Sequence, residues 1–314
     1  MIAPELREIL VCPVCRGPIA GRARSASLEC AACDIVYPSR SGVPILLAPD
    51  LQGTRPEGRG LLSHKAQQVA FFDQDPGEDF GVVRPRTAPE LYGRLLREKF
   101  RRSIIGLEDL LPGATVLVVC GGSGLDAEFL VEAGARVILS DISLGVVLQA
   151  RERSRRFGLD LLLIVADVEA LPFPDRAVEL VYVHDGLHHL ERPAVGLDEM
   201  ARVARRAISV SEPARSLATT AAVRLGWADA REEAGNPVMR LSLGEIVREL
   251  AKRGFRPIRP HRYFMLYRHW PGRAMRTLSR PIALPLAVGA LTIANRVLGR
   301  AGNKLTVQAV RADQ

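Results

Sequence analysis

Four of the five cysteines occur as two identical pairs near the start of the chain. Cys12 and Cys15 form one C-x2-C pair, Cys30 and Cys33 form the other, and fourteen residues separate the pairs. Two such turns bring four thiolates together, which is the tetrahedral sulfur set that Zn2+ prefers. A disulfide scaffold of 314 residues would need more cysteines, and a redox C-x2-C would adjoin a βαβ unit that this segment lacks. The pattern therefore predicts a structural zinc site.

A second group of residues has the pattern of a nucleotide-binding turn. An apolar run at residues 116–120 leads directly into Gly121-Gly122-Ser123-Gly124, and the next apolar run ends at Asp141. Glycines let a ligand approach the backbone, the following helix offers free N–H groups, and the terminal acid accepts hydrogen bonds from ribose hydroxyls. Residues 122–127 satisfy G-x-G-x-x-A, which fits NAD as well as S-adenosylmethionine (SAM). The turn by itself leaves both cofactors open.

Candidate bases for proton transfer follow another apolar run, residues 178–183. His184, Asp185, His188 and His189 come directly after it. Histidine suits this role because its ordinary pKa lies near neutrality, and His188 and His189 are the catalytic candidates. His184, Asp185 and His188 could instead hold a divalent metal, although no second cluster of carboxylates accompanies them. Further pocket candidates are Tyr263, Tyr267 and His269.

Alternating strands and helices must position these residues. Short apolar runs of strand length alternate with segments of helical periodicity, which predicts an α/β fold with a parallel sheet. An S-x-x-E capping box at Ser242 opens one helix, and Gly254 ends it. The expected strands are residues 116–120, 137–139, 162–165, 178–183, 207–210, 255–258 and 304–309, and the other expected helices are residues 64–72, 89–105, 126–133 and 193–205.

The stretch from residue 110 to 265, continued at 303–311, resembles the class I SAM-dependent methyltransferases of type 11. The resemblance rests on the glycine turn, on Asp141, on the A-D-V-E-A-L-P-F segment at 166–173 and on residues 181–190. It implies a Rossmann-like, seven-stranded methyltransferase sheet with SAM as cofactor. The cofactor-binding residues that it implies are Cys120, Gly121, Gly122, Gly124, Asp141, Ile142, Asp167, Val168 and His184.

The resemblance also implies a role for several of these residues. The glycine turn would lie against the methionine part of SAM, and Asp141 would bind the ribose hydroxyls. Asp167 would accept from the adenine amino group, with Val168 beside the ring, and His184 would lie next to the cofactor. Two residues depart from the family pattern: Val118 replaces an acid, and Cys120 replaces the first glycine. We interpret Cys120 as a small residue under the cofactor and not as a reactive thiol.

Residues 10–47 resemble the small zinc-ribbon proteins related to the eukaryotic methyltransferase activator subunit. In that family the ribbon is structural or contacts a partner. The predicted organisation is a zinc-ribbon domain at 1–48, a linker and helical cap at 49–105, and a methyltransferase domain at 106–314 with an insertion at 272–300. In the insertion, Arg273, Arg276 and Arg280 precede an apolar run. It is expected to be a helical hairpin packed on the domain, a lid over an apolar substrate, or a membrane-surface helix.

Composition limits the classes of partner. The net charge is +8, but only four of the 43 basic residues are lysine, and the excess arginine lacks the interleaved aromatic residues used to stack on RNA. The start of the chain lacks the apolar run of a signal peptide, and the longest apolar stretch, residues 282–294, is shorter than the roughly 18–20 residues of a spanning helix. These features predict a cytoplasmic protein without a transmembrane segment.

The expected function is methyl transfer from SAM to a small molecule or metabolite. An RNA- or protein-modifying methyltransferase that docks its substrate through the zinc ribbon is the alternative. The altered glycine turn leaves a non-catalytic SAM-binding regulator as a further alternative. The G-x-G-x-x-A pattern, which NAD-binding proteins share, leaves an NAD-binding Rossmann protein as another.

Overall fold

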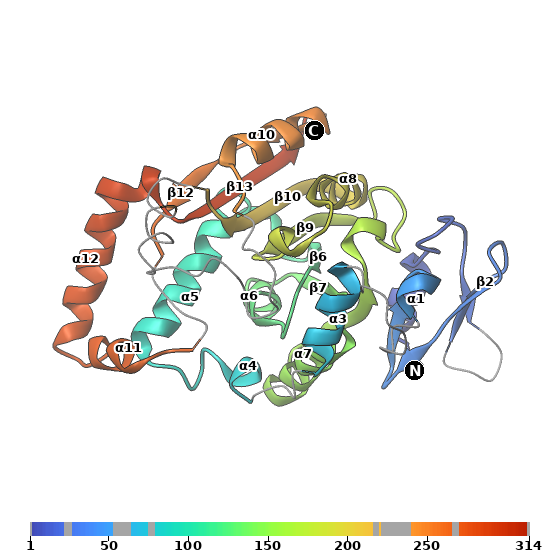
Figure 1. Cartoon of the computed structure of the whole chain (residues 1–314), viewed down its shortest axis with the longest axis horizontal. Helices are drawn as coiled ribbons and strands as arrows, with labels where there is room; N and C mark the ends of the chain where they lie inside the picture. Colours follow the sequence, from blue (N-terminus) through green and yellow to red (C-terminus); the bar gives the residue numbers. More distant parts are fainter. Residues whose placement is uncertain are drawn as a thin grey trace.

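The centre of the molecule is a large, mostly parallel sheet. The computed structural model describes residues 2–21, 27–52, 64–74, 79–215, 220, 240–265 and 270–312. Within these residues a ten-stranded sheet forms the core, and a three-stranded sheet made of β1 (Ala20–Gly21), β2 (Leu28–Cys30) and β3 (Ile35–Tyr37) lies at one end of the long axis (Figure 1). The strands of the large sheet are β4 (Ser39–Arg40), β5 (Val43–Leu46), β6 (Thr115–Val119), β7 (Arg136–Asp141), β8 (Leu161–Ala166), β9 (Val178–His184), β10 (Ala204–Pro213), β11 (Phe255–Pro257), β12 (His261–Tyr263) and β13 (Lys304–Arg311).

Seven strands of the large sheet form its core, in the order β11-β13-β10-β9-β6-β7-β8. The full order is β11-β13-β10-β9-β6-β7-β8-β5-β4, and β12 pairs with β13. Strands β6 to β10 pair in parallel, whereas β13 runs antiparallel to β10. The chain runs outward from β6 through β7 to β8 and then crosses to β9 on the other side. The carboxyl ends of β6 and β9 therefore flank a topological switch point, where open α/β sheets bind ligands.

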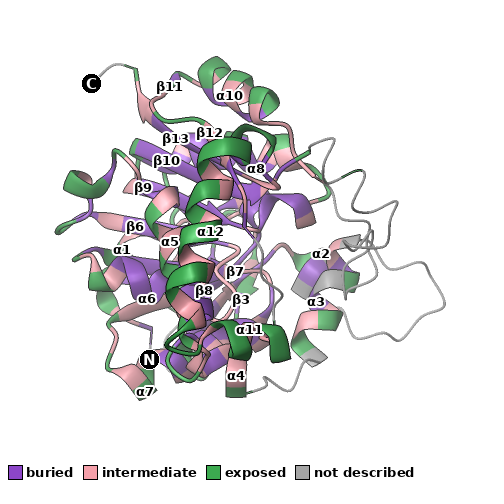
Figure 2. Ribbon diagram, turned by 90° about the vertical axis from the view of Figure 1, so that its left-hand side faces the viewer, coloured by how far each residue is buried: buried purple, intermediate pink, exposed green. Residues whose placement is uncertain are grey.

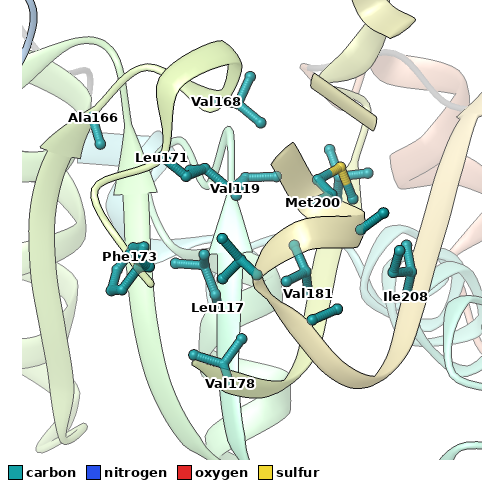
Figure 3. Close-up of a cluster of buried hydrophobic side chains, with 14 of the residues drawn as sticks. Leu117, Val119, Ala166, Val168, Leu171, Phe173, Val178, Val181, Met200 and Ile208 are labelled. Atoms are coloured by element: carbon teal, nitrogen blue, oxygen red, sulfur yellow. The ribbon is translucent and has the colours of Figure 1, made fainter. Parts of the chain in front are cut away.

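Both faces of the sheet are covered, because the central strands carry apolar side chains on both faces. Leu117 and Val119 of β6 pack on one face with Met200 of helix α8 (Pro193–Val203), in the cluster drawn in Figure 3. Val116 and Val118 point to the other face. The remaining helices are α1 (Pro4–Ile9), α2 (Pro49–Gln52), α3 (His64–Gln74), α4 (Asp79–Val83), α5 (Glu90–Ser103), α6 (Leu125–Glu132), α7 (Leu144–Phe157), α10 (Leu243–Lys252), α11 (Arg273–Leu278) and α12 (Ala283–Leu298).

Two local predictions are wrong. The helix expected through Arg205 ends at Val203, because Ala204 already begins β10 and pairs with Val178. The capping box at Ser242 does not form: Ser242 is the residue before α10, but its side chain makes no capping hydrogen bond. Glu245, the expected partner, instead pairs with Arg215 at 3.1 Å.

The N-terminal segment is joined to the large sheet by backbone pairing. Strands β4 and β5 form a hairpin whose two turn residues, Ser41 and Gly42, have φ of 52° and 82°, as a type I′ turn requires. Strand β5 then pairs in parallel with β8, with Leu46 opposite Ala166. The β4–β5 hairpin thus extends the edge of the main sheet, whereas β1, β2 and β3 form a sheet of their own.

The insertion at 272–300 forms α11 and α12. In Figure 1, α12 lies beside α5 at the end of the molecule opposite to α1 and β2. Among the described residues, no helix combines the length and the apolar character needed to cross a bilayer.

Candidate active site and metal centre

The glycine turn connects β6 to α6 and depends on left-handed backbone. Cys120, Gly122 and Gly124 have φ of 51°, 51° and 83°. A Cβ on Gly121 would lie 2.6 Å from the side chain of Leu139, whereas a Cβ on Gly122 would meet nothing within 4 Å. Gly121 is therefore fixed by close packing against β7, and the turn faces open space at Gly122, as a backbone cradle for a ligand must.

Asp141 ends β7 beside this turn. Its carboxylate accepts hydrogen bonds from the N–H of Gly122 at 2.9 Å and of Ser143 at 3.1 Å. The pKa of this carboxyl is raised, because burial outweighs the two backbone donors and the charge of His189, which lower it. Each oxygen keeps a further lone pair for a hydroxyl donor. The next residue, Ile142, packs against the core face that contains Leu139.

Asp167 follows β8 and is contacted by a residue that the sequence reasoning missed. Its Oδ1 accepts from the N–H of Glu169 at 2.9 Å, and its Oδ2 lies 2.5 Å from Nζ of Lys65 on α3. Lys65 also reaches Oε2 of Glu169 at 2.9 Å. Val168 is buried beside them in the hydrophobic core (Figure 3). A single lysine on a helix about a hundred positions upstream gives no spacing signal in the sequence.

Helix α3 crosses the same edge of the sheet at a second point. Asp73 near its end accepts from Oγ of Ser143 at 2.6 Å and from the N–H of Gly145 at 2.9 Å. The ring of Phe72 stands edge-on to His189, with 6.2 Å between centroids. Helix α3 therefore lies across the ends of β7 and β8, with Lys65 at one end and Asp73 at the other.

His184 ends β9 in a buried polar network. Its Nδ1 lies 3.1 Å from Oδ1 of Asp126 and 3.0 Å from the hydroxyl of Tyr182. Burial raises the pKa of Asp126, but the charge and hydrogen bond of His184, with the charge of Lys99, outweigh it and hold the value at about 2. Within the described residues, the buried Nε2 of His184 has no hydrogen-bond partner.

His188 is held by a fully buried carboxylate. Its Nδ1 donates to Oε2 of Glu212 at 2.6 Å. The other oxygen of Glu212 accepts from the N–H of Gly186 at 2.9 Å and of Leu187 at 2.7 Å. The imidazole of His189 lies against that of His188, with 4.1 Å between centroids and 35° between the ring planes. A carboxylate at Nδ1 fixes the tautomer and the orientation of the His188 ring.

The remaining predicted residues at this edge have other partners. Asp185 contacts Lys99 at 2.6 Å and also Lys304. The metal alternative for His184, Asp185 and His188 finds no support, since the described residues bring together only one group of three or more potential metal ligands, the four cysteines. Tyr263 is buried under α5 and α12, and Tyr267 and His269 lie outside the described residues.

Cys120 has the surroundings of an unreactive thiol. Burial raises its pKa well above the usual range, and the charges of Asp141 and Glu212 raise it further. Its side chain occupies the space beside Gly186, where an added Cβ would lie 2.4 Å from Cβ of Cys120. A thiol that stays protonated is a poor nucleophile.

The four cysteine sulfurs form the predicted metal centre. All lie within 4.8 Å of one another, and a tetrahedral zinc with bonds of roughly 2.3 Å would bring them to about 3.8 Å. Arg16 and Asp34, which follow the two C-x2-C turns, both adopt left-handed backbone, with φ of 58° and 53°. Burial raises the pKa of Cys12, but hydrogen bonds, first that of the Tyr37 hydroxyl, lower it to about 7. The residues fit a zinc ion.

The zinc ribbon contacts the loop that carries Asp167 from both sides. Strand β5 pairs with β8 up to Ala166, immediately before Asp167. The N–H of Val11 donates to the carbonyl of Pro172 at 3.0 Å. Arg16 pairs at 2.9 Å with Glu199, which also accepts from the N–H of Leu171.

The residues at the carboxyl edge also fit SAM. The turn is open at Gly122, two carboxylates end adjacent strands, and the buried Nε2 of His184 has no hydrogen-bond partner among the described residues. One family model, described as a methyltransferase domain, matches residues 117–207. A second, described as a Trm112p-like protein, matches residues 4–42 and so includes all four cysteines.

Curated relatives agree with these matches. The chain is 38% identical over 149 residues to the demethylmenaquinone methyltransferase of Corynebacterium urealyticum, which covers 47% of this chain and 59% of that enzyme. It is 30% identical over 199 residues to the demethylmenaquinone methyltransferase of Renibacterium salmoninarum, which covers 60% of this chain and 80% of that enzyme. The chain thus spans about three fifths of the first relative and four fifths of the second.

A solved structure has the same fold. The magnesium protoporphyrin IX methyltransferase of Synechocystis PCC 6803 with bound SAH aligns with 79% of this chain and 99% of its own length, at 17% identity and a TM-score of 0.53. The expected α/β class and methyltransferase-type sheet are confirmed. Together with the matched domain and the relative covered over four fifths of its length, this shows that the chain belongs to the SAM-dependent methyltransferases and carries a Trm112p-like zinc-ribbon segment on its N-terminal side.

Proposed function

We propose that the chain transfers a methyl group from SAM to a small aromatic acceptor of the quinone type. The observation that carries this proposal is the 30% identity to a demethylmenaquinone methyltransferase over 80% of that enzyme. The matched methyltransferase domain favours SAM over NAD for the glycine turn.

The cofactor contacts that we propose follow the carboxyl edge of the sheet. Cys120, Gly121, Gly122 and Gly124 supply the backbone surface for the methionine part. Asp141 accepts from the ribose hydroxyls, beside Ile142. Asp167 accepts from the adenine amino group, with Val168 against the ring, and His184 closes the site at β9. Bound SAM supplies an electrophilic methyl group on a sulfonium.

We propose His188 as the base, with His189 beside it. An acceptor ring that gains a methyl group loses one proton, and S-adenosylhomocysteine is the second product. His188 suits the removal of this proton because imidazole is a base near neutral pH and Glu212 orients its ring through Nδ1 at 2.6 Å. Glu212 is then a positioning residue, since it acts through His188.

A second candidate, modification of RNA or protein, is supported by the Trm112p-like match at residues 4–42. The ribbon uses part of its surface on its own chain, through β5, Val11 and Arg16. These contacts favour a structural role for the ribbon and so favour the small-molecule proposal.

Transfer of a labelled methyl group tests the proposal. The purified chain is incubated with methyl-labelled SAM in three separate reactions. One contains reduced demethylmenaquinone, one total RNA and one a protein extract. We expect label in the quinone fraction. Label in RNA or protein alone would establish the second candidate. Binding of SAH without transfer to any acceptor would favour the non-catalytic regulator.

A further inference from the structure

Helix α12 exposes a continuous apolar stripe. Ile282, Leu286, Ile293 and Val297 lie four, seven and four positions apart, which places them along one side of the helix. Their side chains are 87%, 72%, 62% and 73% exposed. Leu278 of α11 and Leu298, the last residue of α12, are also exposed, at 43% and 52%. Exposed apolar groups that gather in one patch mark an interaction site, whereas scattered ones do not.

The stripe faces outward because the opposite side of α12 packs against the rest of the protein. Leu284, Ala287, Val288 and Leu291 pack against the buried cluster that α5 forms with Tyr263 and Met265. The side chain of Asn295 accepts from the N–H of Phe264 at 2.7 Å and donates to its carbonyl at 3.0 Å. In Figure 2, which faces this end of the molecule, α12 lies in front of the sheet and is mostly exposed. The helix is therefore already partnered on one side and bare on the other.

Positive charge surrounds the stripe. Residues 270–304 contain no Asp or Glu. They contain five exposed arginines, three before α12 and two at its end: Arg273, Arg276, Arg280, Arg296 and Arg300. Trp270, 41% exposed, lies at the start of this segment against Phe80. An apolar helix face with basic residues at both ends matches the boundary between acyl chains and anionic headgroups.

We propose that α11 and α12 dock the protein on the surface of a membrane that contains anionic phospholipid. The exposed apolar side chains enter the boundary of the acyl chains, and the five arginines lie at the phosphate groups. The helix lies on the membrane and does not span it, in line with its 16 residues. A second copy of the chain is a poorer occupant, because a twofold contact would bring the two arginine sets together. The inference goes beyond the proposed function, since it needs no acceptor and no methyl transfer.

Sedimentation with vesicles tests the proposal directly. The full chain is mixed with phosphatidylcholine vesicles or with vesicles that also contain about 30% phosphatidylglycerol, at about 0.1 M and about 0.5 M salt. We expect binding to the anionic vesicles that weakens at the higher salt. A double variant, Leu286→Glu with Ile293→Glu, should bind at least about tenfold more weakly, because it places charge in the stripe.

A matched variant separates the stripe from a general effect of added charge. Val36→Glu makes the same kind of change at an exposed position of β3, at the other end of the molecule, and should bind vesicles as the unchanged chain does. Both variants should keep their circular dichroism spectrum and their affinity for SAH, which shows that they are folded. Equal sedimentation of all three proteins, or none with anionic vesicles at low salt, would overturn the proposal. So would a dimer in solution that the double variant dissociates while no vesicle binding is seen.

Discussion

At the scale of single residues, Cys120 carries the main departure from the family pattern. Its φ of 51° lies in the left-handed region, where a side chain costs about 1–2 kcal/mol relative to glycine. The position therefore keeps the backbone of a glycine turn although it holds a cysteine. The departure leaves the turn geometry intact.

The strain at Cys120 gives a prediction. Cys120→Gly and Cys120→Ala both remove the thiol, but only glycine also relieves the left-handed backbone. We expect the glycine variant to have a free energy of unfolding about 1 kcal/mol higher than that of the alanine variant. Urea unfolding followed by circular dichroism measures the difference. An alanine variant of equal or greater stability would contradict the strained backbone.

Lys65 gives a second prediction at this scale. We propose that the adenine amino group binds Asp167, whose two oxygens accept from the N–H of Glu169 and from Lys65, so that it competes with the lysine for this carboxylate. Lys65→Met should then bind SAH about fivefold more tightly, as measured by calorimetry. Lys252→Met removes an exposed lysine paired with Glu249 and serves as the matched control. Weaker binding by Lys65→Met would mean that the lysine supports the adenine site.

At the scale of elements, the ribbon holds the loop that carries Asp167. Strand β5 pairs with β8 up to Ala166, and Val11 donates to Pro172 beyond the loop. Both contacts come from a segment that four cysteines organise. We therefore expect the zinc site and the proposed adenine end of the cofactor site to be coupled through these backbone hydrogen bonds.

Removal of zinc tests this coupling. Metal analysis should give one zinc per chain, and a chelator that strips it should lower the unfolding temperature by about 5 °C or more. The affinity for SAH should fall as well, because the loop at Asp167 loses its support, and added zinc should restore both. Loss of zinc without any change in SAH affinity would show that the ribbon and the cofactor site are independent.

The sequence predicted the strands and helices better than the contacts between distant segments. The parallel strands and the cysteine cluster follow from apolar runs and C-x2-C spacing, which are local signals. The pairing of β5 with β8 and the reach of Lys65 to Asp167 join segments about 100 or more positions apart, and neither leaves a local signal. The capping box at Ser242 does not form, and Glu245 pairs instead with Arg215, which lies 30 positions away and gives no local signal. The division at residue 48 and the roles of the site residues stay predictions.

At the scale of the whole molecule, the carboxyl edge of the sheet lies between two accessory surfaces. The ribbon is at one end of the long axis, and α12 is at the other (Figure 1). The net charge of +8 includes the five arginines of the α12 segment, which carries no acid. Part of the excess charge thus gathers on the surface formed by α11 and α12.

Asp185 forms ion pairs with lysines of two other elements. We expect these pairs to make the free energy of unfolding depend on pH. Asp185 directly follows β9 and contacts Lys99 of α5 and Lys304 of β13. Burial raises its pKa, but the two lysines outweigh burial and hold the value well below the usual range. The stabilisation is therefore fully present above the unfolded pKa of about 4 and is lost as the pH falls toward the folded value.

The variant Asp185→Asn tests this dependence, because it removes the charge while asparagine tolerates the left-handed backbone at this position, with φ of 52°. At pH 7 it should lower the free energy of unfolding by about 2 kcal/mol. Unfolding curves at decreasing pH should show this difference shrinking below about pH 4. A difference that is constant from pH 7 to pH 2, or absent at pH 7, would contradict the ion pairs.

Binding of SAH by the unchanged chain and by Asp141→Ala tests the central claim most directly. We expect one SAH per chain by calorimetry and an affinity at least about 50-fold lower for Asp141→Ala, because two hydrogen bonds to a charged group are lost. Asp160→Ala, an equivalent change at an exposed position after α7, should bind as the unchanged chain does. Equal affinity for Asp141→Ala, or binding of NADH but not of SAH, would contradict the account.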